Sequence, residues 1–376
     1  MNILFVLSSF AHRAGVERVI SDKMNYLAEH GHHVVFATYE QGNHPLIFPL
    51  HASVVHSDLG CPYFTLYHYP LFLRLLKARL MKRKFKKRLQ SLIERESIDL
   101  LVTPTNAAMF MGEMMNAKRV RKIVESHGAF SNTMIADGII KNVGRKLQLF
   151  AIRKCDLLIS LTDGDAKCWK TYVRNVEVHP NPISLCCENL GSIERQEGRI
   201  LAVGGLNKHK RFDRLIDAFA LLADRYPKWY IDIFGDGDDK EDLEKRIKGV
   251  GLVNRIRINP STPEIASEYQ RSQFLVLSSD TEGFSLVLVE AMECGLPCVA
   301  TDCPFGPASI INDGFSGLLC KMDVKDLSEK MEWMINHENE RMEMGINAHK
   351  AASRYKRDVV MKEWENTYMS LQKNVK

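Results

Sequence analysis

The chain has 376 residues and a formal net charge of +5, and 45% of its residues are hydrophobic and 26% charged. This length exceeds the ~250–300 residues at which a single core usually stops growing, so we expect two domains. The composition excludes a largely disordered chain. The charge is mild for this length, so the positions where basic residues cluster say more about partners than their total does.

The first residues, MNILFVLSSF, are apolar over about seven positions, and no small-residue cleavage site follows a charged segment. We interpret them as a first strand rather than a signal peptide, and no stretch approaches the ~18 apolar residues of a membrane span. The nine cysteines form no C-x-x-C pair, which favours a reducing cytoplasm. Cys294, Cys298 and Cys303 can be imagined as zinc ligands, but we interpret them as core residues.

Short β-branched runs alternate with longer amphipathic segments along the chain. Continuous apolar runs indicate strands covered on both faces, as in parallel sheets with helical crossovers. We therefore predict an α/β fold of two doubly wound, Rossmann-like domains that face a cleft. The predicted strands lie in ILFVLSS, HHVVFATY, SVVHSD, IDLLVTP, RKIVESHG and DLLISLT of the first half, and in RILAVGG, YIDIFGD, RIRINP, QFLVLSS and PCVATD of the second.

The predicted domain boundary follows VHPNPISLCC, where two prolines enclose Asn181 and the sequence then becomes polar. We expect a linker at about residues 182–196, between an N-terminal domain over 1–182 and a C-terminal domain over 197–355. Residues 356–376 form a predicted last helix. Ligands of open α/β folds bind at the carboxyl ends of the strands, so functional motifs should directly follow strands.

The loop after the first strand, SSFAHRAGVERV, places Gly15 at the start of a predicted helix. It lacks the G-x-G-x-x-G fingerprint, so a nicotinamide cofactor has little support. A glycine at a helix start lets backbone amides approach an anion, although an ordinary loop explains the sequence equally well.

The strand in RILAVGG is followed by a Gly204-Gly205 turn and a basic loop with Lys208, Lys210 and Arg211. Cations at a strand-to-helix turn suit a diphosphate, because loop amides and an ammonium act on the same charge. A solvated basic turn is the alternative. We interpret the later FGDGDDKEDLEK as a turn and helix start rather than an acidic metal site.

The segment TEGFSLVLVEAMECGLPCVATD places Glu282 in the loop after a buried strand and Glu290 inside the following helix, with Ser285 as its predicted N-cap. A buried carboxylate needs a partner, and a ribose diol can donate two hydrogen bonds to it. The amides of Gly283, Phe284 and Ser285 offer an anion site. The segment therefore suits a nucleoside diphosphate, while a buried salt bridge from Glu290 to an arginine is the alternative.

The segment RLLKARLMKRKFKKRLQSL, residues 74–89 in particular, interleaves cations with apolar residues. A basic amphipathic helix of this kind binds anionic bilayers, and we expect a peripheral membrane contact here. A solvated helix face is the alternative, and nucleic acid has little support because no stacking aromatic array accompanies the charges. The cations are Arg74, Lys77, Arg79, Lys82, Arg83, Lys84, Lys86, Lys87 and Arg88, and the apolar residues are Leu75, Leu76, Leu80, Met81, Phe85 and Leu89.

The E-x7-E pair Glu282/Glu290, with VGGLNKHKRFDRLIDAF before it and CPFGPASIINDGFSGLL after it, resembles the retaining glycosyltransferases of family 4. The resemblance extends over essentially the whole chain and is strongest from 199 to 320. It implies the GT-B fold, with an acceptor-binding N-terminal domain, a nucleotide-sugar-binding C-terminal domain and a last helix that crosses back to the first domain. The segment Asp302–Pro307 resembles members that use UDP-hexoses or UDP-N-acetylhexosamines.

The resemblance also implies roles for individual residues. Glu290 would hold the ribose, Glu282 and the Gly283-Phe284 backbone would meet the transferred sugar, and Lys210 would neutralise the diphosphate. The implied catalytic residues are Glu282, His127 and Lys210, and the implied donor-binding residues are Gly15, Gly204, Gly205, Lys210, Gly283, Phe284, Ser285, Leu286 and Glu290. His127, in ESHG, taken alone is more often a core histidine.

Two positions depart from the family pattern. The family usually has arginine where this chain has Gly205, and a glycine pair where it has Ala14-Gly15. Lys208 or Arg211 are candidates to replace the missing charge. The absence of that arginine keeps open a catalytically silent sugar-nucleotide-binding partner of another transferase.

We expect a cytoplasmic enzyme, peripheral on the inner face of the cell membrane, that moves a hexose or N-acetylhexosamine from a UDP-sugar to a lipid-linked or surface-glycan acceptor. No metal or other cofactor is required, because a helix terminus and a lysine supply the positive field. Retention by a carboxylate nucleophile would need a second carboxylate beside Glu282, so front-face attack by the acceptor hydroxyl is favoured. A UDP-N-acetylglucosamine 2-epimerase-like enzyme, which needs no acceptor, is the alternative within the same fold.

Overall fold

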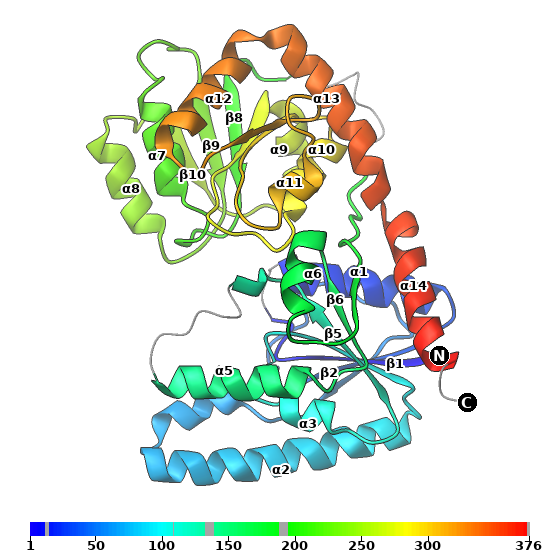
Figure 1. The fold of residues 1–376 in the computed structure, drawn as a ribbon. Helices are drawn as coiled ribbons and strands as arrows, with labels where there is room; N and C mark the ends of the chain where they lie inside the picture. Colours follow the sequence, from blue (N-terminus) through cyan, green and yellow to red (C-terminus); the bar gives the residue numbers. More distant parts are fainter. Residues whose placement is uncertain (12–14, 108, 132–138, 188–194, 374–376) are drawn as a thin grey trace. The chain divides into compact units, whose positions relative to one another are not determined.

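The structure is a computed structural model that describes residues 1–376 except 12–14, 108, 132–138, 188–194 and 374–376. Its contacts divide the chain into two compact units, Met1–Pro182 together with Arg357–Lys376, and Ile183–Lys356. Each unit contains one parallel sheet with helices on both faces (Figure 1). This arrangement confirms the predicted α/β fold with two doubly wound domains, while residues 188–194 of the predicted linker lie outside the described residues.

The sheet of the first unit has the order β3-β2-β1-β4-β5-β6-β7. Its strands are β1 (Asn2–Leu7), β2 (His33–Thr38), β3 (Val55–Asp58), β4 (Leu100–Pro104), β5 (Arg121–Ser126), β6 (Leu157–Ser160) and β7 (Val176–Val178). Its helices are α1 (Gly15–Glu29), η1 (Tyr63–His68, a 3₁₀ helix), α2 (Leu71–Arg95), α3 (Met111–Met115), α5 (Ile139–Ile152), α6 (Asp163–Trp169) and α14 (Arg357–Lys373). The winding reverses between β1 and β4, so the loops after these strands meet at the topological switch point.

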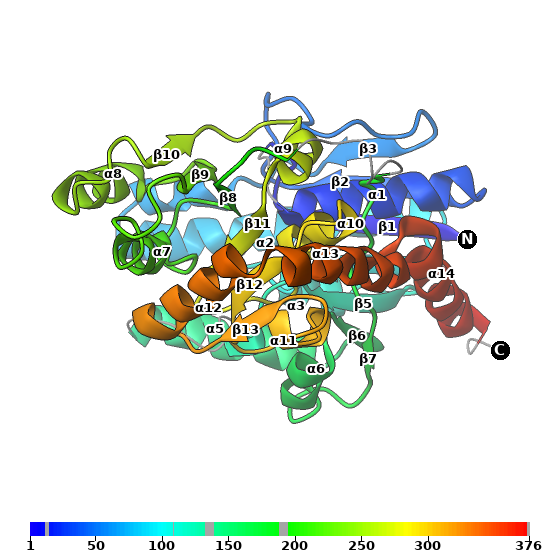
Figure 2. The same cartoon turned by 90° about the horizontal axis from the view of Figure 1, so that it is seen from above.

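The last helix, α14, is part of the core of this first unit. It packs beside α1 in both views (Figure 1, Figure 2), and its Trp364 and Tyr368 side chains are fully buried. The Trp364 indole donates a hydrogen bond to the Pro180 carbonyl over 2.9 Å. The N-terminal sheet is therefore covered on one face by residues from the far end of the chain.

The sheet of the second unit has the order β10-β9-β8-β11-β12-β13, and its winding reverses between β8 and β11. Its strands are β8 (Arg199–Val203), β9 (Tyr230–Phe234), β10 (Ile256–Asn259), β11 (Phe274–Leu277), β12 (Cys298–Thr301) and β13 (Leu318–Cys320). Its helices are α7 (Phe212–Ala220), α8 (Lys240–Gly249), α9 (Ile265–Arg271), α10 (Leu286–Glu293), α11 (Pro307–Ile310), α12 (Val324–Asn336), α13 (Glu338–Ala352) and η2 (Ser353–Tyr355, a 3₁₀ helix).

Helix α10 is enclosed because other helices pack on both of its sides. It contacts α9 and α13, and its Leu288, Val289 and Met292 side chains are completely buried. The close approach of α13 requires glycine at position 345, since a Cβ there would lie 2.4 Å from the Gly295 carbonyl oxygen. This packing explains why the sequence of α10 is apolar on nearly every side.

The sequence predictions of strands differ from the structure at three places. The strands β7 and β13 were not predicted, because runs of three residues carry too little periodicity to identify. Strand β3 was predicted to be covered on both faces, but it is the outermost strand of its sheet and three of its four residues are exposed.

Candidate functional site

Two loops at the carboxyl edge of the C-terminal sheet bring the predicted Lys210 and Glu282 together. The loops follow β8 and β11, which are neighbours at the switch point. The Lys210 Nζ atom lies 2.7 Å from Glu282 Oε1. The Asp280 backbone N–H donates to the His209 carbonyl over 2.9 Å, and the Ser278 hydroxyl donates to the Lys210 carbonyl over 2.8 Å. The two loops that carry the ion pair are therefore hydrogen-bonded to each other, which holds Lys210 and Glu282 together.

The carboxylate of Glu282 is held from several directions. Its Oε1 atom also accepts a hydrogen bond from the Ser279 hydroxyl over 2.6 Å, and only 8% of the residue is exposed. The Ser279 carbonyl in turn accepts from Thr301 Oγ1, at the end of β12, over 2.6 Å. A Cβ at Gly306 would lie 2.6 Å from the Glu282 Cβ, so glycine there keeps space for this side chain.

The N-terminus of α10 lies directly after Glu282 in the chain. Ser285 occupies the N-cap position, as predicted, but its side chain makes no capping hydrogen bond. Its hydroxyl and that of Thr281 are buried and, within the described residues, have no hydrogen-bond partner. Buried polar atoms are almost always satisfied, and the first N–H groups of a helix have no intrahelical acceptor, so this terminus suits an anionic ligand.

Glu290 is buried inside α10 and is 3% exposed. Its Oε2 atom accepts a hydrogen bond from the Tyr269 hydroxyl over 3.0 Å. This donor lies on α9, the helix that packs against α10. Tyr269 was not predicted to belong to the site, because nothing local distinguishes it from an ordinary core tyrosine.

The basic loop after β8 supplies one cation at the site, Lys210. Arg211 is hydrogen-bonded to Asp213 and Asp280, each at 2.9 Å, and Lys208 is exposed. Arg211 is therefore poorly placed to substitute for the arginine that the family pattern has at position 205. Gly205 itself is exposed, and a Cβ there would meet only Asn207 Nδ2 at 3.2 Å and the Asp236 carbonyl at 4.0 Å.

The N-terminal unit carries the predicted Gly15 and His127 after separate strands. Gly15 is the first residue of α1 and is exposed, while Ala14 lies outside the described residues. His127 follows β5, and its side chain is 4% exposed. Its Nε2 atom lies 2.7 Å from Glu125 Oε2, and its Nδ1 atom is buried and has no partner in the described part of the chain. Burial lowers the pKa of His127.

Glu125 is the centre of a buried charged cluster that the sequence did not predict. Lys23 Nζ lies 3.0 Å from its Oε2, and the Tyr368 hydroxyl donates to its Oε1 over 2.8 Å. Burial raises the pKa of Glu125, but Lys23 and His127 outweigh it and hold the pKa at about 2. Burial lowers the pKa of Lys23 to about 8 against the attraction of Glu125, and the Lys23 ammonium lies 3.1 Å from the centre of the Trp364 ring.

One sequence signal could have identified part of this cluster. Lys23 falls on the apolar stripe of α1 with Val19, Ile20, Met24 and Leu27, where a charged residue is out of place. Glu125 precedes His127 by two residues, so both side chains point to the same side of an extended chain. Tyr368 is 243 residues away from Glu125, and no local pattern connects them.

Comparison with known proteins identifies the family. The family described as Glycosyltransferase Family 4 matches residues 13–185, and the family described as Glycosyl transferases group 1 matches residues 191–351. The chain belongs to these glycosyltransferases. An uncharacterized glycosyltransferase of Haemophilus influenzae is 26% identical over 96% of this chain and 98% of its own length. The amylovoran biosynthesis glycosyltransferase AmsD of Erwinia amylovora is 30% identical over 59% of this chain and 64% of its own length.

Solved structures share the GT-B fold of this glycosyltransferase. Sucrose-phosphate synthase from Thermosynechococcus elongatus superposes with a TM-score of 0.80 at 16% identity, over 98% of each chain. HepE from Anabaena, solved in complex with UDP, superposes with a TM-score of 0.76 at 16% identity, over 98% of this chain and 100% of its own. The resemblance of the sequence to family 4 and the predicted fold are thereby confirmed.

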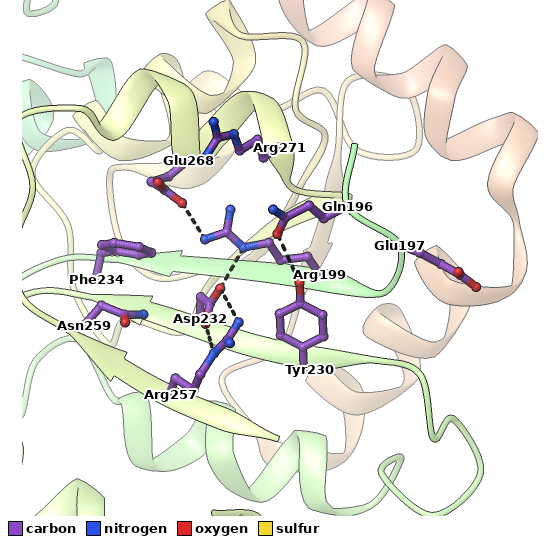
Figure 3. Close-up of a pocket in the computed structure, with 10 residues that line it drawn as sticks. All are labelled: Gln196, Glu197, Arg199, Tyr230, Asp232, Phe234, Arg257, Asn259, Glu268 and Arg271. Atoms are coloured by element: carbon purple, nitrogen blue, oxygen red, sulfur yellow. Dashed lines mark hydrogen bonds and ion pairs between the residues drawn. The ribbon is translucent and has the colours of Figure 1, made fainter. Parts of the chain in front are cut away.

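A hollow with a volume of about 630 Å³ lies on the C-terminal sheet of the glycosyltransferase (Figure 3). Asp232 on β9 lies between the guanidinium groups of Arg199 and Arg257, each with an N···O distance of 2.7 Å, and Glu268 on α9 pairs with Arg199. None of the predicted site residues lines it. Because these charges pair with one another, the geometry fits an ion-pair network that joins three strands to a helix.

Three further observations concern the rest of the glycosyltransferase. Cys294, Cys298 and Cys303 are buried core residues, as predicted. The described ranges contain no group of three or more histidine, cysteine or acidic side chains placed to hold a metal ion. No helix in the described part of the chain has the length and apolar character to cross a membrane.

The Glu125 cluster predicts a specific acid sensitivity. A carboxyl whose pKa falls from 4.5 to about 2 on folding stabilises the protein above pH 4.5, and this stabilisation is lost as the pH falls toward 2. The wild type should therefore lose up to about 3 kcal/mol more unfolding free energy between pH 5 and 2 than the Lys23→Met/Glu125→Gln variant. Urea unfolding at each pH measures this difference.

Tyr368→Phe is the matched control, since it removes one hydrogen bond from the cluster and keeps both charges. It should retain the acid slope of the wild type. An equal slope in the wild type and the double variant would show that the carboxyl of Glu125 is not held ionised by folding.

Proposed function

We propose that this protein is a retaining glycosyltransferase that moves a hexose or N-acetylhexosamine from a UDP-sugar to a hydroxyl of a lipid-linked or surface-glycan acceptor. The observation that carries the proposal is the Lys210–Glu282 pair at the switch point, beside a helix terminus with two buried hydroxyls that have no partner among the described residues. The UDP that HepE binds on the same fold supports the choice of nucleotide. The biosynthetic relative AmsD supports a glycan acceptor.

In the proposed complex, the diphosphate binds between Lys210 and the N-terminus of α10. The ammonium and the helix amides act on the same negative charge, and the hydroxyls of Thr281 and Ser285 are available to donate to phosphate oxygens. The ribose hydroxyls donate to Glu290, which already accepts from Tyr269. Gly204, Gly205 and Gly283 allow the backbone to come close to the donor, and Phe284 and Leu286 border it.

The proposed reaction breaks the bond between the anomeric carbon and the phosphate oxygen, and forms a bond between that carbon and the acceptor oxygen. The acceptor proton passes to the departing phosphate on the same face of the sugar. Lys210 and the α10 terminus stabilise the charge on the leaving group, and loss of one such donor typically costs ~10²–10³ in rate. No metal takes part in this scheme.

Glu282 is better suited to positioning the sugar than to attacking it. Its Oε1 atom already accepts from Lys210 and Ser279, so the carboxylate is oriented and partly neutralised. A nucleophilic carboxylate in a retaining enzyme normally has a second carboxyl ~5 Å away to assist it. Front-face attack, which needs no such pair, remains the proposed route to retention.

Helix α2 is the proposed contact with the membrane. Its first half exposes large apolar residues, of which Phe72 is 78% and Leu75 64% exposed, among cations. The predicted membrane face is wrong at Phe85 and Leu89, because both are buried in the core of the first unit. The exposed apolar surface instead runs from η1 to Leu80 in the first half of α2. Its exposed members are Phe64, Tyr67, Tyr69, Leu71, Phe72, Leu73, Leu75, Leu76 and Leu80.

Gly205 supports a second candidate, a catalytically silent protein that binds the donor for another transferase. The position that usually carries arginine in the family is an exposed glycine in this chain. Arg211 forms ion pairs with Asp213 and Asp280 and so does not replace that arginine. Donor binding without turnover would favour this candidate. Turnover of the donor without any acceptor would favour the epimerase-like alternative.

The donor site predicts a selective response to nucleotides. A ligand at ~100 times its dissociation constant stabilises a protein by ~2.7 kcal/mol. Among UDP, GDP, ADP and CMP, UDP should raise the melting temperature of the wild type, and Glu290→Gln should lose most of this shift because the ribose loses a charged acceptor. Differential scanning fluorimetry measures the effect.

Glu268→Gln is the matched control for that experiment. It changes a glutamate on the neighbouring helix α9 that lines the hollow around Arg199 and Asp232, the Arg199 pocket, and should leave the UDP shift unchanged. If Glu268→Gln removes the shift and Glu290→Gln does not, the nucleotide binds in the Arg199 pocket and the proposed donor site is wrong.

Gly205 predicts a gain of affinity on substitution. Gly205→Arg should lower the UDP dissociation constant about tenfold, since a charge-assisted hydrogen bond contributes ~1.5–3 kcal/mol. A Cβ at this position would lie 3.2 Å from Asn207 Nδ2, so the Asn207 side chain has to shift slightly to admit the arginine. Isothermal titration calorimetry gives the constant. Gly249→Arg, which adds the same charge at the end of α8 where a Cβ meets nothing within 4 Å, should have no effect. Weaker binding in Gly205→Arg would contradict the proposed position of the diphosphate.

Helix α2 predicts binding to anionic membranes. The protein should float with vesicles that contain phosphatidylglycerol and not with phosphatidylcholine alone, and Lys86→Gln/Lys87→Gln should reduce the partition coefficient about 30-fold at ~1 kcal/mol per cation. Phe72→Ser/Leu76→Ser should also reduce it. Lys325→Gln/Lys350→Gln, in the other unit, is the charge-matched control. Equal binding to both vesicle types would contradict the membrane contact.

A further inference from the structure

His127 is hydrogen-bonded to Glu125, and the residues around Glu125 determine whether its carboxyl group is ionised. The Oε2 atom of Glu125 is shared by His127 and Lys23, at 2.7 and 3.0 Å, and its Oε1 atom accepts from Tyr368 at 2.8 Å. Three elements, α1, β5 and α14, thus supply the titratable groups that face one another. All four side chains are buried, so solvent supplies little of their hydrogen bonding.

An ionised carboxylate only accepts hydrogen bonds, and this fixes the proton on the imidazole. Lys23 and Tyr368 both donate to Glu125. Burial raises the pKa of Glu125, but Lys23 and the hydrogen bond with His127 outweigh it and hold the pKa at about 2. The Nε2 atom of His127 must then carry the hydrogen that points at Glu125. A second proton on Nδ1 would be a buried donor without an acceptor in the described chain, which is costly, and burial accordingly lowers the pKa of His127.

We propose that Glu125 is a positioning residue that fixes His127 as a neutral imidazole with its proton on Nε2, so that Nδ1 is a hydrogen-bond acceptor for a sugar hydroxyl. The proposal rests on the proposed function for the identity of the hydroxyl. Lys23 and Tyr368 support the ring through Glu125, as the carboxylate of a catalytic triad orients its histidine. The ring is consequently matched to a hydroxyl donor, and a phosphate, which only accepts, does not suit it.

In this assignment, the two units contribute different chemical groups to donor binding. Positive charge for the diphosphate comes from Lys210 and the α10 terminus in the C-terminal unit. His127 contributes no charge, because its surroundings disfavour the imidazolium. Replacing it therefore removes a hydrogen bond to the sugar and leaves nucleotide binding intact.

The ring state is measured directly by long-range ¹H–¹⁵N correlation spectra of the full-length protein labelled on histidine, with His127→Asn to assign the signals. The wild type should show a protonated Nε2 and an unprotonated Nδ1 at pH 7.5, and the pKa of the ring should lie below its ordinary value because the ring is buried. Lys23→Met/Glu125→Gln removes both charges together, because Glu125→Gln alone would leave a buried lysine unpaired. In this variant the two nitrogens should shift toward the average of two tautomers. Tyr368→Phe should keep the wild-type pattern.

A protonated Nδ1 in the wild type, or ring signals that do not change in the double variant, would overturn the assignment of Glu125. These spectra need no donor or acceptor. They therefore test the positioning role even if the protein turns over no sugar nucleotide.

The role of Nδ1 is tested by UDP release from UDP-glucose and UDP-N-acetylglucosamine. The amide of asparagine lies near the position of Nδ1 and that of glutamine near Nε2. His127→Asn should therefore retain at least tenfold more of the wild-type kcat than His127→Gln, with similar KM values. Equal or greater activity in His127→Gln overturns the acceptor role. No turnover by the wild type with either sugar counts against the proposed function, and the spectra then decide the ring assignment alone.

Discussion

A parallel sheet that reverses its winding direction forces two distant loops to share one edge. In the C-terminal unit the reversal falls between β8 and β11, and it brings Lys210 within 2.7 Å of Glu282, 72 positions along the chain. The other features of the candidate donor site depend on this placement. The hydrogen bonds between the loops, the support of Ser279 by Thr301 and the requirement for Gly306 all maintain the same carboxylate.

Both units bury carboxylates, and they differ in how the free-energy cost of burying this charge is compensated. Unpaired buried charges are expensive, and a pair is tolerated only when its remaining hydrogen-bonding positions are filled. Glu125 is fully enclosed and has a lysine, a histidine and a tyrosine around it. Glu282 accepts from Lys210 and Ser279 and lies just before α10, where the buried hydroxyls of Thr281 and Ser285 have no partner among the described residues. The protein itself fills the hydrogen-bonding positions of the Glu125 carboxylate, whereas two hydroxyls at the α10 terminus remain available to a ligand.

The sequence predicted the features that depend on local periodicity and on the rule that ligands bind after parallel strands. All strands except β7 and β13, and the positions of Lys210 and Glu282 in loops that directly follow β8 and β11, were predicted from these two principles. The interpretation of residues 74–89 as one amphipathic face was wrong at Phe85 and Leu89, because α2 is longer than the face that the core covers and its two halves have different surroundings. Lys23 was detectable as a charge on an apolar stripe. The partners of Glu125 and Glu290 from distant helices were not, since tertiary contacts of this kind leave no local pattern.

The contribution of α14 to the N-terminal unit has a consequence for how the protein is made. Tyr368 donates to a carboxylate that is synthesised 243 residues earlier, and Trp364 covers the buried lysine of the same cluster. At ~5–20 residues per second, a ribosome extends the chain for about 10–50 s between these two points. During that time the N-terminal sheet holds an ion pair that its own segment cannot enclose. Chaperones that recognise exposed apolar surface have this interval in which to act, and the N-terminal unit is completed only after the C-terminal unit has been synthesised.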